Sequence, residues 1–302
     1  MTDCMARDDG AGRRRGRRWK IALGVLGAFV LAVGVSVLVC AVCIHTVRYS
    51  AALDGVTAPV RLVCVSDLHG RSFGRGNARL AEKIAAQDPD AICLLGDMLG
   101  PGADAADAQR LLALVARLRE IAPVYFAVGN HEQTYLAQDP DFLDAVTAAG
   151  AVVVNDSYVD VTLAGQPLRI GGTLGHAFPF GRTAEEFAAS PEYRFLTAFE
   201  DTERPTVCLA HMPDTFIFNG AAGYWDVDLV LSGHTHGGLI RLPWVGGLYV
   251  PMQGWFPTYD RGQFWLSSTM QMIVTSGLSG YKAVPRVNNL PEIAVVTLTG
   301  AA

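Results

Sequence analysis

The sequence predicts an α/β domain in which two mixed β-sheets pack face to face between outer helices. This is a four-layer α-β-β-α sandwich, preceded by a single N-terminal transmembrane helix. Three observations lead to this fold. An uncharged run of 24 residues lies near the N-terminus, short apolar runs alternate with amphipathic stretches from residue 60 onward, and the second half of the chain adds more apolar runs than one sheet holds comfortably.

The N-terminus joins a basic tail to the apolar run. Residues 1–48 contain eight Lys/Arg and three Asp/Glu, a net charge of +5. The run Ile21–Ile44 is long enough to cross the bilayer core at about 1.5 Å per residue. We therefore expect residues 1–20 to form a basic cytoplasmic tail and residues 21–44 a transmembrane helix. The positive-inside rule then places the C-terminal domain outside the cell membrane.

Two other interpretations of this segment are less favoured. A cleavable signal peptide has a shorter apolar run, of roughly 7–15 residues, followed by a small-residue cleavage site that is not evident here. The pair Arg17-Arg18 is compatible with a twin-arginine export signal. Lys20, however, stands where such a signal usually has a bulky apolar residue.

Charge and size restrict the partners. The chain of 302 residues is half hydrophobic and can bury the core of one large domain. Because residues 1–48 carry +5 and the whole chain carries −5, the remainder carries −10. An acidic globular part is a poor electrostatic match for nonspecific nucleic-acid binding, so no nucleic-acid partner is expected.

The part after the apolar run is predicted to be a linker over residues 45–59 and one domain over residues 60–302. Three β-prone runs in the domain each end at a polar motif: Val60–Val65, Ala91–Leu95 and Pro123–Val128. Amphipathic helices are expected between them at Arg79–Ala86 and Ala105–Arg119. This order predicts right-handed βαβ units and a mostly parallel sheet.

Further apolar runs predict more strands than one sheet accommodates. They are Val152–Asn155, Tyr158–Leu163, Leu168–Ile170, Thr206–Ala210, Leu229–Ser232, Ile273–Thr275 and Ile293–Leu298. Two packed sheets with helices outside are therefore favoured. Cys64, Cys93 and Cys208 lie within strand-like runs, which favours buried thiols over disulfides.

Five polar motifs occur in a fixed order along the domain. They are Asp67-Leu68-His69, Gly96-Asp97, Gly129-Asn130-His131-Glu132, a lone His211, and Gly233-His234-Thr235-His236. Each motif alone is common, and a lone histidine is more often a core residue than a ligand. Together they supply oxygen and imidazole donors without a thiolate, which suits a pair of hard or borderline divalent cations.

The spacing of these motifs is consistent with one shared site. Asp67 and His69, at the end of the first strand, are two residues apart and are expected to point to the same side. Asp97 ends the second strand, and its two carboxylate oxygens could bridge two cations. Asn130 ends the third strand. Strand C-terminal ends are where open α/β sheets place their ligands, and the neighbouring glycines permit tight turns and close backbone approach there.

The order and wording of the motifs resemble the calcineurin-like metallophosphoesterases, a family of two-metal phosphate-ester hydrolases. Three later segments, 240–243, 259–262 and 286–293, resemble a bacterial branch whose members are membrane-associated or exported. The resemblance extends from about Arg61 to Leu298. Gly100, Leu239 and Ser276 depart from the branch pattern, where Asp, Gln and Arg are frequent, and none of the three is a metal ligand.

The resemblance implies a role for each motif residue. The first metal would be held by Asp67, His69, Asp97 and His236. The second metal would be held by Asp97, Asn130, His211 and His234. His131 would face the substrate phosphate and stabilise developing charge or protonate the leaving oxygen. The two divalent ions would be Mn, Fe or Zn, and no other cofactor is implied.

The implied function is a membrane-anchored dinuclear-metal phosphoesterase that hydrolyses phosphate mono- or diesters by attack of a metal-bridging hydroxide. A pyrophosphatase of a nucleotide-activated lipid or sugar is an alternative within the same chemistry. A catalytically silent metal-binding module is the alternative from another class, although every ligand and His131 are present. The short linker over residues 45–59 is expected to keep the domain close to the membrane, which leads to the hypothesis that the phosphoester is lipid-linked.

Two further features have structural interpretations. His176 follows a glycine-rich stretch and is interpreted as structural or as part of a rim. An aromatic stretch is interpreted as core and loop packing, with a substrate- or membrane-facing rim as the alternative. Its residues are Trp244, Tyr249, Trp255, Phe256, Tyr259, Phe264 and Trp265.

Overall fold

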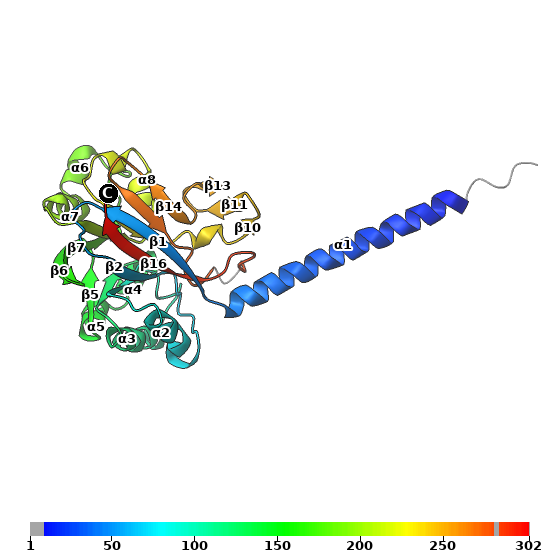
Figure 1. Cartoon of the computed structure of the whole chain (residues 1–302), viewed down its shortest axis with the longest axis horizontal. Helices are drawn as coiled ribbons and strands as arrows, with labels where there is room; N and C mark the ends of the chain where they lie inside the picture. Colours follow the sequence, from blue (N-terminus) through cyan, green and yellow to red (C-terminus); the bar gives the residue numbers. More distant parts are fainter. Residues whose placement is uncertain (1–8, 281–283, 302) are drawn as a thin grey trace, which may run out of the picture.

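The computed structural model describes residues 9–280 and 284–301, and its domain is built on two six-stranded sheets (Figure 1). The first sheet contains, in spatial order, β1 (His45–Leu53), β16 (Glu292–Gly300), β2 (Val60–Val65), β3 (Ala91–Leu94), β4 (Val124–Ala127) and β5 (Ala151–Val154). The second contains β14 (Gly262–Trp265), β15 (Gln271–Val274), β9 (Leu229–Ser232), β8 (Thr206–Ala210), β7 (Gln166–Thr173) and β6 (Ser157–Leu163).

Both sheets are mixed, as the sequence predicts. Strands β2 to β5 are parallel, and β16 pairs with β2 in the antiparallel sense. Strands β7, β8, β9 and β15 are also parallel, with antiparallel β6 and β14 at the two edges. The parallel strands of each sheet therefore end at one common edge, where the polar motifs follow them.

Side-chain alternation along the strands explains the four layers. In β2, Leu62 and Cys64 belong to the core between the sheets, whereas Val63 and Val65 face the outer helices. Those helices are α2 (Ala78–Ala85), α3 (Ala105–Arg119) and α5 (Phe142–Ala148). The second sheet repeats the arrangement: residues of α6 (Ala184–Ala188), α7 (Pro191–Glu200) and α8 (Asp214–Ile217) cover its outer face. The predicted α-β-β-α sandwich is confirmed.

Local signals set the helix boundaries. Asp104 forms a capping box with Asp107 at the start of α3. Ser190 caps α7, whose first residue is Pro191. A further short helix, α4 (Asn130–Leu136), follows β4 directly. The single-turn helices are η1 (Arg75–Asn77), η2 (Ala221–Gly223) and η3 (His236–Gly238).

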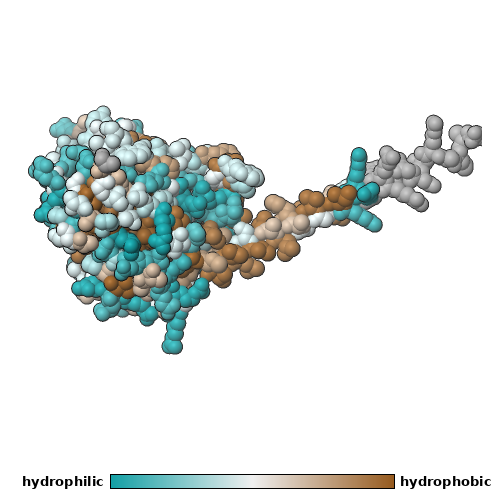
Figure 2. All heavy atoms as spheres, viewed as in Figure 1, coloured by the Kyte–Doolittle hydropathy of each residue, from teal (hydrophilic) through white to brown (hydrophobic). Residues whose placement is uncertain are grey.

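Most of the N-terminal apolar run lies in one long helix, α1 (Asp9–Val42), which leaves the domain (Figure 1) and is mostly hydrophobic over the part nearer the domain (Figure 2). Residues 17–42 are long and apolar enough to cross a membrane, a test that an N-terminal signal sequence also passes. Residues 1–8 of the expected basic tail lie outside the described part of the chain.

The predicted linker over residues 45–59 does not match the structure. Its first nine residues form β1, which pairs in parallel with β16 from His45↔Glu292 to Leu53↔Gly300. The sequence does not show this strand because β1 is an edge strand with several partly exposed residues, so it has no continuous apolar run. Only two residues separate α1 from the sheet.

Several hydrogen bonds fix the end of α1 to the domain. The Arg71 guanidinium donates to the Ala41 carbonyl, and Arg79 donates to the Val42 carbonyl at 3.0 Å. The backbone N–H of Asn288 donates to the Ser36 hydroxyl at 2.7 Å. Cationic side chains on the last carbonyls are favourable at a helix C-terminus because of its partial negative charge.

Two short hairpins project from the domain between η3 and β14. The first pairs β10 (Arg241–Leu242) with β11 (Gly246–Gly247), and the second pairs β12 (Tyr249–Val250) with β13 (Gly254–Trp255). We call residues 242–256 the flap. The expectation that the aromatic stretch serves core and loop packing is wrong for several of its side chains that are exposed, among them Trp244, Trp255, Phe256 and Trp265.

Candidate metal centre

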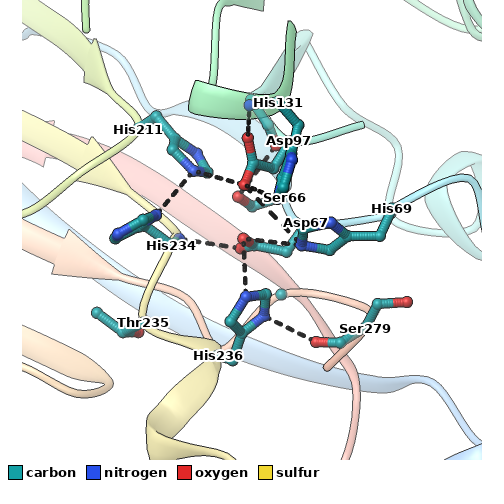
Figure 3. A network of polar contacts seen from close by, with 12 residues as sticks. Ser66, Asp67, His69, Asp97, His131, His211, His234, Thr235, His236 and Ser279 are labelled. Atoms are coloured by element: carbon teal, nitrogen blue, oxygen red, sulfur yellow. Dashed lines mark hydrogen bonds and ion pairs between the residues drawn. The ribbon is translucent and has the colours of Figure 1, made fainter. Parts of the chain in front are cut away.

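The motif residues meet at the carboxyl edge of both sheets (Figure 3). Asp67 follows β2, Asp97 follows β3, and Asn130 opens α4 directly after β4. His211 follows β8, and the pair His234 and His236 follows β9. This edge is where parallel α/β sheets carry their ligand-binding loops.

The backbone reaches the site through an unusual conformation. Asp67, His69, Asp97, His234 and His236 all have positive φ, between 49° and 65°. Asp67 and His69 therefore do not lie on one face of a strand, as the sequence analysis expects, but in the turn after it. Positive φ is uncommon for residues other than glycine, and such strain concentrates at functional sites.

Two glycines allow the loops to approach closely enough. A Cβ atom on Gly129 would lie 2.3 Å from the Asp97 backbone nitrogen and 2.3 Å from its Oδ1. A Cβ atom on Gly233 would lie 1.9 Å from the Ser66 hydroxyl and 2.7 Å from Asp67 Oδ2. Both contacts are impossible for a larger residue, so these glycines permit the close packing that the spacing of the motifs predicts.

The first group of side chains gathers around Asp67. The His69 Nε2 and His236 Nε2 atoms each lie 3.8 Å from Asp67 Oδ1. The other carboxylate oxygen, Oδ2, accepts the His234 backbone N–H at 3.1 Å. The ligand atoms of Asp67, His69 and His236 all lie within 4.8 Å of one another, close enough to share one cation.

The second group gathers around Asp97. Its Oδ2 lies 3.2 Å from His211 Nε2, and that nitrogen lies 3.3 Å from His234 Nδ1. His69 Nε2 approaches the same Asp97 oxygen at 3.9 Å, so Asp97 lies between the two groups. Asp97 Oδ1 accepts the His131 backbone N–H at 2.9 Å, which fixes the carboxylate plane.

Backbone carbonyls orient two of the imidazoles. His211 Nδ1 lies 2.7 Å from the Leu95 carbonyl, and His236 Nδ1 lies 2.9 Å from the Ser279 carbonyl. Because a carbonyl can only accept, each Nδ1 carries a proton, and Nε2 is the ring nitrogen directed at the centre. This is how protein metal sites commonly orient their histidine ligands.

Three buried polar atoms at the centre have no hydrogen-bond partner within residues 9–280 and 284–301. They are Asp67 Oδ1, His69 Nε2 and Asn130 Oδ1. A buried acceptor without a partner is costly, so it usually indicates a water, an ion or a catalytic role. A carboxylate oxygen, an imidazole nitrogen and an amide oxygen are all suitable ligands for a divalent cation. The residues present therefore fit the metals that the resemblance implies.

The ionisation states also suit cations. Burial by itself would raise the pKa of Asp97, but His211 lowers it to about 2. Burial would likewise raise the pKa of Asp67, but His236 and His69 hold it well below its usual range. Burial lowers the pKa of His234 and of His236 to about 4. At neutral pH the centre thus offers charged carboxylates together with neutral imidazoles at His234 and His236.

His131 differs from the other imidazoles. Its ring is the most exposed of those at the centre, and its Nε2 lies 3.7 Å from Asp97 Oδ2. Its ring packs edge-on against His69 at a centroid distance of 4.9 Å. Burial lowers the pKa of His131, whereas Asp97 raises it less strongly. This placement leaves the ring partly exposed at the rim of the centre.

Sequence reasoning missed the role of Glu132. Its buried carboxylate accepts the backbone N–H groups of Asp97, Leu99 and Gly129 at 2.7–2.9 Å. It thereby ties the Asp97 loop to the first turn of α4, where it occupies the third helical position. The signal available in the sequence was a glutamate three residues after Gly129, at the spacing of a capping box.

Comparisons with known proteins agree with this centre. The model of the family described as calcineurin-like phosphoesterase matches residues 60–238, more than half of the chain. The chain belongs to the calcineurin-like phosphoesterase family. The predicted resemblance to this family is thereby confirmed.

Relatives of this calcineurin-like phosphoesterase occur in bacteria and animals. It is 26% identical over 240 residues to a metallophosphoesterase of Helicobacter pylori, covering 77% of this chain and 58% of that protein. It is 26% identical over 215 residues to metallophosphoesterase YkuE of Bacillus subtilis, covering 71% and 70%. It is also 26% identical over 262 residues to a zebrafish transmembrane protein with a metallophosphoesterase domain, covering 80% and 54%.

Two residues that depart from the branch pattern, Gly100 and Ser276, lie near the centre of this phosphoesterase. Gly100 lines a cavity of about 380 Å³ beside His69, together with Arg71 and Ser279. Ser276 lies next to the buried Arg286, whose guanidinium donates to the carbonyls of Ser276 and Ser279. The Arg286 guanidinium thus lies beside Ser276, the position at which the branch pattern frequently has an arginine.

Proposed function

We propose that this chain is a membrane-anchored dinuclear phosphoesterase that hydrolyses phosphate mono- or diesters at the outer surface of the membrane. One observation carries the proposal. Two carboxylate–imidazole groups meet at Asp97, and three buried atoms without a hydrogen-bond partner among the described residues lie among them: Asp67 Oδ1, His69 Nε2 and Asn130 Oδ1.

The proposed ligand sets follow the two groups. Asp67, His69, Asp97 and His236 would hold one ion, and Asp97, Asn130, His211 and His234 would hold the other. Two bound divalent cations would supply Lewis-acid neutralisation of the phosphate oxygens and lower the pKa of a coordinated water. The protein's part is to fix these ligands, through the Leu95 and Ser279 carbonyls and the Glu132 carboxylate.

His131 is proposed as the general acid. Its partly exposed imidazole lies at the rim of the centre, and its backbone N–H donates to Asp97 Oδ1. From this position the ring would protonate the leaving-group oxygen as the ester bond to phosphorus breaks. A positioned acid of this kind contributes a typical factor of 10²–10⁴ in rate.

Strand register supports a substrate at the membrane surface. β1 begins two residues after α1, and His45 pairs with Glu292 of β16. β16 runs antiparallel to β2, and Ala294 near its start lies opposite Cys64 near the end of β2. The end of β2 that leads to Asp67 therefore lies at the same sheet edge as the start of β1 and the end of α1. The centre therefore opens on the side from which α1 leaves.

A second cavity connects this edge with α1. It measures about 250 Å³ and is lined by Val37, Cys40 and Ala41 of α1. Arg71, Ser279 and Gly280 line both this cavity and the one beside His69. An ester carried on a lipid could lie along α1 and present its phosphate past Arg71, so a lipid-linked phosphoester is the proposed substrate class.

The experiment that tests the proposal measures hydrolysis with and without added Mn²⁺. The substrates are p-nitrophenyl phosphate, bis-p-nitrophenyl phosphate and a lipid-linked pyrophosphate, presented to the full-length protein in liposomes. We expect metal-dependent hydrolysis of at least one p-nitrophenyl ester. Turnover of the pyrophosphate alone would assign the alternative pyrophosphatase activity. Metal binding without any turnover would indicate a silent module and would contradict the proposal.

A further inference from the structure

The flap exposes a group of large apolar side chains. The exposed fractions are 103% for Trp244, 67% for Trp255 and 57% for each of Met252 and Phe256. Residues 242–259 contain no charged residue and no histidine. So many large exposed apolar side chains on one short segment mark a candidate protein or membrane interaction site.

The flap also places bulky residues where the backbone favours glycine. Trp244 and Met252 lie at the tips of the two hairpins and have φ of 64° and 66°. Glycine or asparagine would relieve this strain and would also be more soluble. The choice of a tryptophan and a methionine at exposed tips is therefore hard to explain by folding alone.

A chain of hydrogen bonds joins the flap to α1. The Asn288 side chain donates to the Arg241 carbonyl at the root of the flap, and the Asn288 backbone N–H donates to Ser36 of α1. Ser36 lies six residues before the last residue of α1, which is about 9 Å along a helix axis. The flap root is thus level with the part of α1 that would lie in the outer leaflet, on the side of the domain where α1 leaves (Figure 1).

We propose that the flap inserts into the outer leaflet of the bilayer beside α1. This inference rests on the proposed membrane anchoring by α1. Tryptophan and tyrosine favour the membrane interface, where an apolar ring and a polar atom are both accommodated. The occupant of the flap surface is a lipid bilayer, because the neighbouring apolar element is the candidate membrane helix and the flap has no charge to pair with a protein partner.

Insertion of the flap into the bilayer would couple the membrane to the metal centre. The flap root packs directly on η3, which carries His236. A Cβ on Gly238 would lie 2.6 Å from the Gly247 Cα, so the two backbones are in contact. Arg241 Nη1 donates to Asp260 at 2.7 Å and to the Gly237 carbonyl at 3.0 Å. Insertion of the flap therefore holds the His236 loop at the depth of the lipid phosphates.

The test is tryptophan quenching by brominated phosphatidylcholine in vesicles that contain the full-length chain. Trp19 lies on α1, so all variants carry W19F. We compare this background with the added pair W244F and W255F. The control is W265F. Trp265 is 61% exposed, and it lies at the last position of β14, at the sheet edge opposite to the metal centre. The flap pair should lose most of the quenching, and W265F should retain it.

The outcomes separate this inference from the anchoring on which it rests. If the protein floats with the vesicles but W244F and W255F leave quenching unchanged, the flap does not dock and the inference is wrong. Protection of the flap by a second copy of the chain, seen as a dimer together with absent quenching, also overturns it. If the protein does not float with vesicles at all, the anchoring itself fails and the inference fails with it.

Discussion

The two carboxylates at the centre are buried, and a buried carboxylate needs a nearby positive charge to stay ionised. Asp67 and Asp97 are almost fully buried, and each approaches two or more imidazoles. Without a cation, His211 must supply that charge. Burial would lower its pKa, but Asp97 raises it to about 10. A divalent cation between Asp97, His211 and His234 would supply the charge instead and leave the imidazole neutral.

Two substitutions test the bridging role of Asp97. Asp97→Ala should abolish hydrolysis and release metal, because its Oδ2 lies between both groups and no neighbouring carboxylate can replace it. His234→Ala should likewise abolish activity and lower the metal content. Elemental analysis of the purified variants measures the loss. Normal metal content in Asp97→Ala would contradict the two-metal assignment.

His131→Ala separates acid catalysis from metal binding. The variant should keep its metal content, because the ring lies at the rim and not within either proposed ligand set. Its turnover should fall by a factor on the order of 10²–10⁴, the usual contribution of a general acid. Elemental analysis and initial rates with bis-p-nitrophenyl phosphate check both parts. Loss of metal in proportion to loss of rate would make His131 a ligand.

At this scale the sequence predicted which residues meet but not how the backbone brings them there. Residue types and motif order were enough to place Asp67, Asp97 and His211 in one centre. The positive φ of Asp67 and His69 could not be predicted, because it depends on the packing of Gly233 against Ser66 from a distant loop. Tertiary contact, not local propensity, sets these turns.

At the scale of elements, α4 depends on one buried carboxylate. Glu132→Ala would leave the N–H groups of Asp97, Leu99 and Gly129 without an acceptor. Each such loss costs about 1–3 kcal/mol, so we expect destabilisation of at least about 3 kcal/mol. Chemical denaturation measures it, with Glu120→Ala at the exposed end of α3 as the control. Equal stability of the two variants would show that water satisfies these donors.

The buried Asp214 at the start of helix α8 should make the stability of the folded state depend on pH. Burial raises the pKa of Asp214 to about 6, and neither carboxylate oxygen has a hydrogen-bond partner. The unfolded pKa is about 3.9, so between about pH 4 and pH 6 the folded state holds a proton that the unfolded state has released. The contribution of Asp214 to stability is therefore present below pH 4 and is lost as pH rises through 6.

Asp214→Asn tests this sign because the amide stays neutral at every pH. The melting temperature of the variant, relative to the parent chain, should increase from pH 4 to pH 7.5. Both proteins are measured in chelator, so that release of metal at low pH affects neither comparison. The exposed Asp226→Asn serves as the control and should show no such trend. A difference that does not change with pH would disprove the shift.

The elements found from sequence are those with continuous apolar runs. β2, β8 and β9 match the predicted ranges, and α3 does so as well. β1 and β14 escaped prediction because both are edge strands, each with only one neighbour and several partly exposed residues. Such strands take their stability from pairing with distant segments, here residues 292–300 and 271–274, which local patterning does not reveal.

At the scale of the whole molecule, the sheet edge that carries the candidate metal centre is joined to the candidate membrane helix α1 without a flexible linker. A flexible linker over residues 45–59 would have let the domain turn freely at the membrane. Instead, β1 begins two residues after α1, and Arg71 and Arg79 bind the last turn of the helix. The orientation of the candidate metal centre relative to α1 is therefore a property of the fold.

This rigidity leads to a prediction about substrate access. Insertion of ten Gly/Ser residues between Ile44 and His45 should free the domain while leaving α1 and the centre intact. We expect hydrolysis of a phosphoester embedded in the same liposome to fall strongly. Hydrolysis of soluble bis-p-nitrophenyl phosphate should stay unchanged, because its access does not depend on orientation. The ratio of the two rates, measured on full-length protein in liposomes, is the readout.

The control is the same insertion at Gly165, in the turn between β6 and β7, where a Cβ atom on the glycine would meet no other atom within 4 Å. That turn lies away from α1, so both rates should stay near those of the parent. A flexible chain of ten residues has a typical end-to-end distance of about 18 Å, enough to release the contacts of Arg71 and Arg79 with α1. If the insertion after Ile44 changes neither rate, or lowers both equally, orientation at the membrane does not govern access, and the substrate reaches the centre from the aqueous phase.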